Sequence, residues 1–200
     1  MPTKKRVEKI KRVLSLRQPD LRLVLEDVTN THNASAVVRT CDAAGILYVD
    51  IISSRKDTFI INEAVSTRAE KWLQFCFYSS TGECIDYLKG EGFKIAVTSL
   101  YSDSLSYTLL DYNQPLAIIF GNESEGISNE ARKRADYIIK IPIIGMVQSL
   151  NLSVSVGVIL YEAVNQRQKR GYFNKTHLSL EKLQIYQKKW LTSPAKKSKK

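Results

Sequence analysis

Three polar segments of this 200-residue chain hold the side chains best suited to chemistry. They are NASAVVRTCDAAG (33–45), FGNESEGIS (120–128) and IPIIGMVQSLN (141–151). Each lies where a predicted strand passes into a loop or helix. Ligands of open α/β sheets bind outside the carboxyl ends of the strands, so the three segments are candidates for a ligand site.

The first segment places an asparagine and an arginine on one predicted helix. Asn33 and Arg39 are separated by roughly 9 Å of helix rise. Long side chains on a helix lean toward its N-terminus, and Ser35 and Ala36 are small enough to leave that path open. The Arg39 side chain could therefore reach the same ligand site as Asn33. In the alternative interpretation, Asn33 is only an N-cap and Arg39 a solvated charge.

The second segment combines glycines with carboxylates. Gly121, directly after a buried strand, lets a ligand approach the backbone, and Gly126 permits a second tight bend. Glu123 and Glu125 place carboxylates at the end of the strand. A plain polar loop, with Ser128 capping the next helix, would have the same composition.

The third segment is a loop ahead of an apolar helix. Gly145 loosens the loop, and Gln148, Ser149 and Asn151 supply polar groups beside the helix start. Ser149 or Asn151 alternatively serves only as the cap. Part of the run 150–163 alternates with a period of two, as in a strand, but its length predicts a helix.

Strands alternate with helices along the chain. Strands are predicted at residues 21–28, 46–52, 93–98, 115–120 and 137–144, and helices at 34–45, 129–135 and 150–163. This order predicts an α/β fold with a mainly parallel sheet that is flanked by helices on both faces. We find no internal repeat and no linker that would divide the chain.

The net charge of +10 indicates a polyanionic partner, because lysines and arginines release counterions when they neutralise phosphates. Near the N-terminus, Val7, Ile10, Val13 and Leu14 recur at helical spacing, which gives one face for docking and one for phosphates. The candidate RNA contacts there are Lys4, Lys5, Arg6, Lys9, Arg12 and Arg17. The basic ending AKKSKK suits a solubilising tail equally well.

Several other classes of protein are excluded. No apolar run reaches the roughly 18 residues of a membrane helix, and the N-terminus lacks a signal peptide's apolar stretch, so we expect a cytoplasmic protein without a membrane partner. Cys41, Cys76 and Cys84 form no C-x-x-C pair, and His32 and His177 are the only histidines, so neither disulfides nor a metal are expected. A dinucleotide fingerprint in the right context, a P-loop and a nucleophile elbow are absent.

Taken in order, the three segments resemble the motifs of the SpoU family of RNA ribose 2′-O-methyltransferases, within the SPOUT superfamily. The resemblance runs from about Gln18 to Gln168, through RQPDLRLVLEDVTNTHNASAVVRTCDAAGI, EKW, LAIIFGNESEGIS and IKIPIIGMVQSLNLSVSVGVILYEA. It is closest to the branch that methylates a tRNA guanosine, which the basic ends also fit. It implies S-adenosyl-L-methionine as the methyl donor and, as substrate, guanosine 18 in the D-loop of tRNA.

The resemblance also implies an architecture. The C-terminal part of the domain should form a trefoil knot, and two copies of the chain should form a homodimer with the active site at the subunit interface. The expected domains are a basic N-terminal helical extension (1–20), a SPOUT methyltransferase domain (21–168), and a basic C-terminal helical extension and tail (169–200).

By the same resemblance, the catalytic residues are Asn33, Arg39, Glu123, Ser149 and Asn151. The cofactor-binding residues are Thr98, Gly121, Asn122, Glu123, Gly126, Ile141, Gly145, Met146, Ser149, Leu150 and Asn151. Arg39 would act either as an unusual general base or, because a guanidinium normally keeps its proton, as a clamp on the phosphate and alkoxide. Arg167 is a further expected RNA contact, and Asn165 stands where similar proteins often have another arginine.

Two alternatives stay open. One is SpoU-type 2′-O-methylation of another tRNA position or of rRNA, although relatives of the anticodon-loop type are similar to the core alone and lack both basic extensions. The other is a non-catalytic RNA-binding protein on the same fold, against which the joint presence of the five catalytic-type residues argues.

Overall fold

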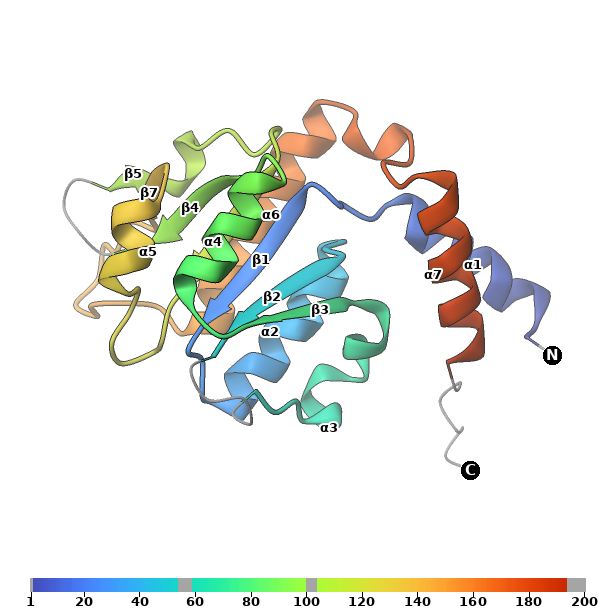
Figure 1. Cartoon of the computed structure of the whole chain (residues 1–200), viewed down its shortest axis with the longest axis horizontal. Coiled ribbons are helices and arrows are strands. Elements are labelled where there is room, and N and C mark those ends of the chain that lie inside the picture. The colour runs from blue at the N-terminus through green and yellow to red at the C-terminus, as the bar shows by residue number, and fades with distance from the viewer. Residues whose placement is uncertain (1, 54–58, 100–103, 194–200) are drawn as a thin grey trace.

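The computed structural model describes residues 2–53, 59–99 and 104–193. Within these ranges seven strands form one sheet in the order β3-β2-β1-β6-β4-β7-β5, and each neighbouring pair is parallel (Figure 1). The strands are β1 (Leu21–Glu26), β2 (Tyr48–Ile52), β3 (Gln74–Tyr78), β4 (Lys94–Thr98), β5 (Leu105–Ser106), β6 (Leu116–Phe120) and β7 (Tyr137–Lys140). The predicted α/β fold with a mainly parallel sheet is confirmed, and the trefoil knot stays a prediction.

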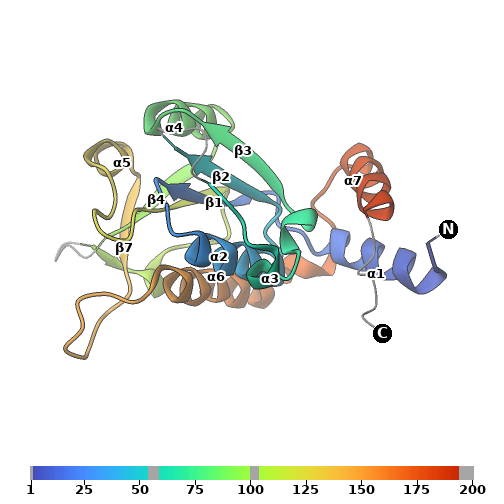
Figure 2. The same ribbon diagram turned by 90° about the horizontal axis from the view of Figure 1, so that it is seen from below.

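Helices cover both faces of the sheet (Figure 2). They are α1 (Lys4–Ser15), α2 (Thr31–Ala43), α3 (Glu63–Ser66), η1 (Ala69–Trp72), α4 (Thr81–Gly90), η2 (Tyr107–Leu109), α5 (Asn129–Arg134), α6 (Leu152–Lys169), η3 (Tyr172–Asn174) and α7 (Leu180–Thr192). Successive strand residues point to opposite faces, so Leu23 and Leu25 join a core with α2 and α6, whereas Val24 joins another with α4 and α5. None of the helices in the described ranges is long and apolar enough to cross a membrane.

Most of the run 150–163, in which apolar residues partly alternate with a period of two, belongs to the helix α6, as its length predicted. Its buried residues Val156, Ile159, Leu160 and Ala163 recur at helical spacing and face the core shared with α2. Gly157 also faces α2, since a Cβ placed there would lie 3.9 Å from the Thr40 methyl group. The small residues of α6 therefore allow two helices to pack closely on one face of the sheet.

The strands end earlier than predicted in two places. Strand β1 stops at Glu26, where Asp27 turns into the left-handed region with a φ of 49°. Strand β7 stops at Lys140, ahead of Pro142. The segment that contains α3, η1 and β3 was not predicted at all, because β3 is an edge strand whose side chains are only partly buried.

The helices α1 and α7 pack against each other beside the sheet (Figure 1). Ile10 and Leu14 of α1 join Trp190 of α7, together with Leu47 and Leu178, in a separate small core. Both predicted terminal extensions are thus helical, while the domain boundaries themselves stay a prediction. The basic ending at residues 194–200 lies outside the described residues.

Two arginines that we expected to contact RNA are instead fully buried. Arg17 pairs with Asp42 and lies over the Trp190 ring, 5.1 Å from its centroid. The Arg167 Nη1 atom donates to Asp20 Oδ1 at 2.6 Å. A guanidinium held under the surface cannot meet a phosphate, so the prediction of RNA contact is wrong for both residues.

A third buried arginine ties the central strand to its neighbour. Arg22 of β1 meets Asp50 of β2 through two hydrogen bonds, Nε to Oδ2 at 2.7 Å and Nη2 to Oδ1 at 2.6 Å. The two residues are 5% and 0% exposed. The Tyr48 ring covers the guanidinium, with its centroid 4.7 Å away. A buried charge pair of this kind stabilises the fold only as long as both partners are present.

We expect Asp50→Ala to lower the free energy of unfolding by about 3–5 kcal/mol, because it leaves a buried guanidinium without its partner. Urea unfolding measures the change. The matched control is Glu63→Ala, which removes an exposed pair with Arg68 (Nε to Oε2, 3.0 Å) and should cost less than about 1 kcal/mol. Equal losses in the two variants would contradict a structural role for the buried pair.

Candidate active site

A cavity of about 630 Å³ opens at the carboxyl ends of β4, β6 and β7. Its wall consists of the loop after β6, the loop between β7 and α6, and the first turn of α2. Ile141, Leu150 and Leu152 contribute apolar surface, and Thr98 and Glu123 contribute polar groups. This size and mixed lining are typical of sites that enclose a small organic ligand.

The side-chain amide of Asn33 joins the three polar segments. Its Nδ2 donates to Glu123 Oε1 at 2.9 Å, and its Oδ1 accepts from Asn151 Nδ2 at 3.0 Å. Asn33 lies 90 residues before Glu123 and 118 before Asn151. The segments that the sequence singled out therefore meet in one site.

The alternative in which Asn33 only caps a helix is wrong. The cap of α2 is Asn30, whose Oδ1 accepts from the backbone N–H of Asn33 at 3.0 Å. Asn33 thus lies inside the first turn, where its own amide is free to bind Glu123 and Asn151. Asn151 has both functions, because its Oδ1 also caps α6 by accepting from the Ser153 N–H at 2.8 Å.

The loop after β6 is held by its own backbone. A Cβ at Gly121 would lie 2.1 Å from the carbonyl oxygen of Gly126, so a residue with a side chain does not fit there. Gly126 has a φ of +73°. Asn122 closes the turn, because its Nδ2 donates to Asp27 O at 2.8 Å and its Oδ1 accepts from the Ser124 N–H at 2.8 Å. The loop consequently presents Glu123 in a fixed position.

Glu26 secures the far end of this loop. Its carboxylate is 2% exposed and accepts from the Ser128 N–H at 2.9 Å, the Ser128 hydroxyl at 2.7 Å and the Thr81 hydroxyl at 2.6 Å. The predicted Ser128 cap of α5 is confirmed. Glu26 was not predicted to belong to the site. The sequence signal for it was a carboxylate at the end of a strand that is buried along its whole length.

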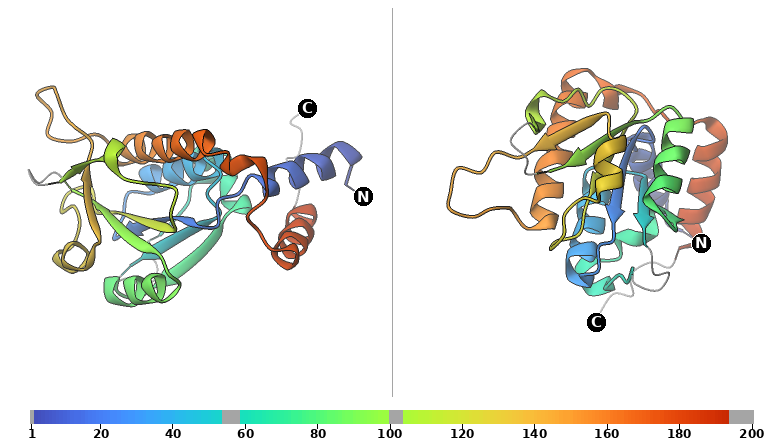
Figure 3. Two further views of the ribbon diagram at one scale, coloured as in Figure 1. Left: turned by 90° about the horizontal axis from the view of Figure 1, so that it is seen from above. Right: turned by 60° about the vertical axis from the view of Figure 1, so that its left-hand side comes forward.

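Most of the residues expected to hold the cofactor line the cavity. These are Thr98, Gly121, Asn122, Glu123, Gly126, Ile141, Ser149, Leu150 and Asn151. Gly145 and Met146 do not, because they lie exposed in the loop between β7 and α6, which projects from the body of the chain (Figure 3).

Arg39 does not line the cavity either. It is six residues after Asn33, which is one and two-thirds turns of helix, so the two side chains leave α2 in different directions. Arg39 is exposed, and among the described residues it has no hydrogen bond or ion pair. The prediction that the Arg39 and Asn33 side chains reach the same ligand site is wrong within a single chain.

The described residues hold no group of three His, Cys, Asp or Glu side chains placed to bind a metal ion.

Burial raises the pKa of the Cys41 and Cys84 thiols, which keeps both protonated near neutral pH.

Comparison with known proteins identifies relatives. The model of the SpoU rRNA Methylase family matches residues 20–161. The chain is 39% identical over 186 residues to the tRNA (guanosine(18)-2′-O)-methyltransferase of Aquifex aeolicus, covering 93% of this chain and 88% of the relative. It is 41% identical over 189 residues to the protein of the same name from Thermus thermophilus, covering 94% and 97%.

Solved structures agree with these sequence relatives. The TrmH/SpoU tRNA modifying enzyme of A. aeolicus superimposes with a TM-score of 0.89 at 39% identity, covering 94% of this chain and 95% of that one. The SpoU methyltransferase AviRb from Streptomyces viridochromogenes, solved in complex with AdoMet, superimposes with a TM-score of 0.68 at 27% identity, covering 78% and 64%.

We expect Gly121→Ala to destabilise the protein by about 1–3 kcal/mol, because the added methyl group would force the loop after β6 apart. Urea unfolding tests this. The control is Gly90→Ala, at the end of α4, where a Cβ meets nothing within 4 Å. That variant should be neutral or slightly more stable. Indistinguishable stabilities of the two variants would contradict the close approach of Gly121 to Gly126.

Proposed function

Because the chain belongs to the SpoU family of RNA methyltransferases, we propose that it transfers a methyl group from S-adenosyl-L-methionine to the ribose 2′-hydroxyl of guanosine 18 in tRNA. The observation that carries this proposal is the amide network of Asn33 with Glu123 and Asn151, in a chain about 40% identical to guanosine-18 methyltransferases over more than nine-tenths of its length. The reaction would take place in the cytoplasm, where the tRNA substrate is found.

The cavity fits the donor. The backbone of Gly121 lines the wall, and Ile127, Ile141 and Leu152 offer apolar surface for an adenine ring. Thr98 and Leu150 lie on the rim formed by the strand end and the loop before α6. When bound, the donor supplies an electrophilic methyl group on a positively charged sulfur.

The residues of the chain would position the ribose. A 2′-hydroxyl is a weak nucleophile that must meet the methyl group in line, so fixed polar groups lower the barrier by orienting it. The Glu123 carboxylate is exposed on the cavity side and is held by Asn33, which allows it to accept a hydrogen bond from the sugar. Ser149 and Asn151 shape the loop around it. Arg39 would stabilise the alkoxide and the neighbouring phosphate, or take up the proton.

A second subunit would complete the site, and we infer a homodimer. Arg39 lies outside the cavity of its own chain, so another copy must bring it there. The loop between β7 and α6, together with the outer face of α6, exposes a set of large apolar side chains, namely Ile144, Met146, Val147, Val154 and Tyr161. Exposed apolar patches of this kind are typical of protein interfaces.

Methyl mapping tests the substrate. Protein and methyl-labelled donor are incubated with an unmodified tRNA transcript, and the labelled nucleotide is identified by nuclease digestion. We expect one methyl group, on the ribose of guanosine 18. The matched control is the same tRNA with 2′-deoxyguanosine at position 18, which lacks the accepting hydroxyl and should stay unlabelled. A methyl group at another tRNA position or in rRNA would favour the corresponding alternative, and no transfer to any RNA despite donor binding would favour the non-catalytic one.

Mixed dimers test the shared site. We expect Arg39→Ala to abolish turnover with donor affinity nearly unchanged by calorimetry, and Thr98→Trp to abolish donor binding by filling the cavity. If Arg39 acts across the interface, a mixture of the two inactive variants regains activity, because one of the two sites in each mixed dimer has both parts intact. Each variant alone, at the same total concentration, is the control. Continued inactivity of the mixture, with mixed dimers shown to form, would place Arg39 in the site of its own chain.

A further inference from the structure

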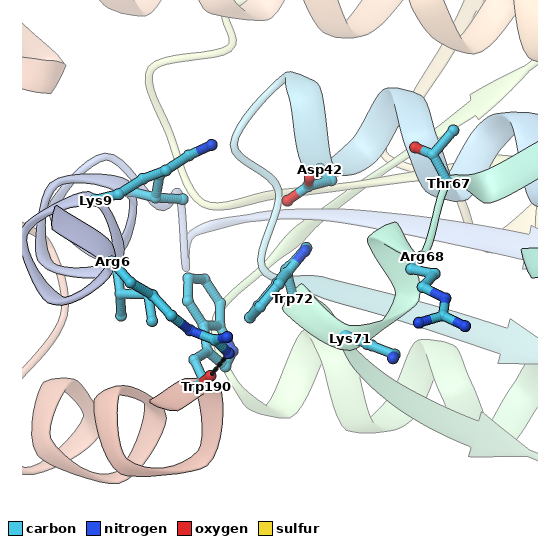
Figure 4. A pocket seen from close by; sticks show the side chains of 10 residues that line it. Arg6, Lys9, Asp42, Thr67, Arg68, Lys71, Trp72 and Trp190 are labelled. Atoms are coloured by element: carbon cyan, nitrogen blue, oxygen red, sulfur yellow. Dashed lines mark hydrogen bonds between the residues drawn. The ribbon is translucent and has the colours of Figure 1, made fainter. Parts of the chain in front are cut away.

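A second cavity, of about 440 Å³, lies between α1, α7 and the turn that joins α3 to η1 (Figure 4). It is far from the active site. The helix α2 spans both, with Asn33 in the active site and Asp42 on the wall of the second cavity, and these residues are separated by about 14 Å of helix rise. The second cavity therefore does not belong to the donor site.

Positive charge dominates its lining, which includes four cationic side chains and one carboxylate. The cations are Arg6, Lys9, Arg68 and Lys71. The carboxylate of Asp42 is already paired with the buried Arg17. Lys9 and Lys71 have no ion-pair partner within the described part of the chain, and Figure 4 shows them on opposite sides of Trp72, Lys9 on α1 and Lys71 on η1. Two unpaired ammonium groups at one cavity favour an anionic ligand.

Aromatic surface accompanies the charge. Both tryptophans of the chain, Trp72 and Trp190, line the cavity. Trp190 is 1% exposed, and within residues 2–53, 59–99 and 104–193 its Nε1 has no hydrogen-bond partner. Trp72 packs on it edge to face, with ring centroids 5.3 Å apart and an interplanar angle of 71°. Trp72 itself is only partly buried and lies in the middle of the cavity in Figure 4, so its ring is available to a planar ligand.

The turn that carries Arg68 and leads into η1, where Lys71 lies, has an unusual backbone. Thr67 and Arg68 follow one another in the left-handed region, with φ of 54° and 67°. Residues other than glycine seldom adopt this conformation, and two in succession are rarer still. Backbone strain of this kind is concentrated at ligand clamps and active sites. Here it directs Arg68 and Lys71 to the same cavity as Trp72.

We propose that this cavity binds one unpaired nucleotide of the tRNA, with its base stacked on Trp72 and the phosphates on either side of it facing Lys9 and Lys71. The proposal rests on the proposed function for the identity of the RNA. The nucleotide must be unpaired, because a base reaches an aromatic ring only after it leaves its own stack. An inorganic anion would use the lysines but leave the tryptophan ring without a contact. The nucleotide lies outside the donor cavity of the same chain, which is at the other end of α2.

Intrinsic fluorescence reports on this cavity directly, because both tryptophans line it. We expect an unmodified tRNA transcript to quench the emission, and the quenching to fall sharply in Trp72→Phe. Inorganic phosphate and guanosine monophosphate serve as small probes, and quenching by either at the same phosphate concentration would assign the cavity to a free anion or nucleotide instead. Binding of tRNA in a filter assay without any change in emission would overturn the proposal.

Substitutions test the two kinds of contact. Trp72→Leu should weaken tRNA binding about 5- to 150-fold through the loss of one stacked base, whereas Trp72→Phe keeps an aromatic ring and should bind nearly as well as the wild type. Lys9→Glu and Lys71→Glu should each weaken binding and reduce the slope of log Kd against log salt by about 1. The matched control is Lys11→Glu, which makes the same charge change on α1 two residues from Lys9 and so on the opposite side of the helix. An equal effect of Lys11→Glu would indicate general charge attraction and contradict a built site.

Steady-state kinetics separate this proposal from the proposed function. In Trp72→Leu we expect a higher KM for tRNA with kcat and donor affinity unchanged, because Trp72 does not line the donor cavity. Urea unfolding of each variant shows whether it is folded. If guanosine 18 is methylated while the cavity variants bind tRNA normally, the cavity proposal fails and the proposed function stands. If no RNA is methylated while those variants lose RNA binding, the proposed function fails and the cavity proposal stands.

Discussion

The arrangement of the active site depends on the side-chain amide of Asn33. An amide carries a donor and an acceptor on adjacent atoms, and Asn33 uses them for two segments that are far apart in the chain, the loop with Glu123 and the start of α6 with Asn151. This is possible only because Asn30 caps α2 and leaves the Asn33 side chain free. The parallel sheet supplies the rest, since it brings the carboxyl ends of β1, β6 and β7 to the same edge.

The polar groups of the site are fixed before any ligand binds. Gly121 and Gly126 are in close backbone contact. Asn122 donates to the Asp27 carbonyl after β1 and accepts from the Ser124 N–H within its own loop. Glu26 holds the start of α5 through Ser128. A site that is already ordered loses little entropy when it positions a substrate, which matters most for a reaction that depends on alignment. The buried carboxylate of Glu26 is thus as much a part of the site as the residues that line the cavity.

Burial decided which strands and which site residues could be predicted from the sequence. The strands β1, β2, β4, β6 and β7 were found because buried parallel strands read as apolar runs, and the site segments because they follow such runs. The strand β3 was missed because it lies at the sheet edge, with Phe77 64% exposed. Arg17 and Arg167 were misassigned because formal charge does not show whether a guanidinium is buried against a carboxylate 25 or 147 residues away. Such long-range pairs exist only in the folded chain.

The cationic side chains of the chain therefore differ in their surroundings. The buried arginines stabilise the fold, and Lys9 and Lys71, without ion-pair partners in the described part of the chain, face a cavity with an aromatic wall. Because α2 separates that cavity from the donor cavity of the same chain, an RNA that contacts both must hold two nucleotides at a fixed distance. A folded tRNA meets that condition, whereas a flexible strand would have to be ordered first, at a cost in binding free energy. If the cavity binds a second nucleotide as proposed, the shape of the RNA would contribute to substrate selection.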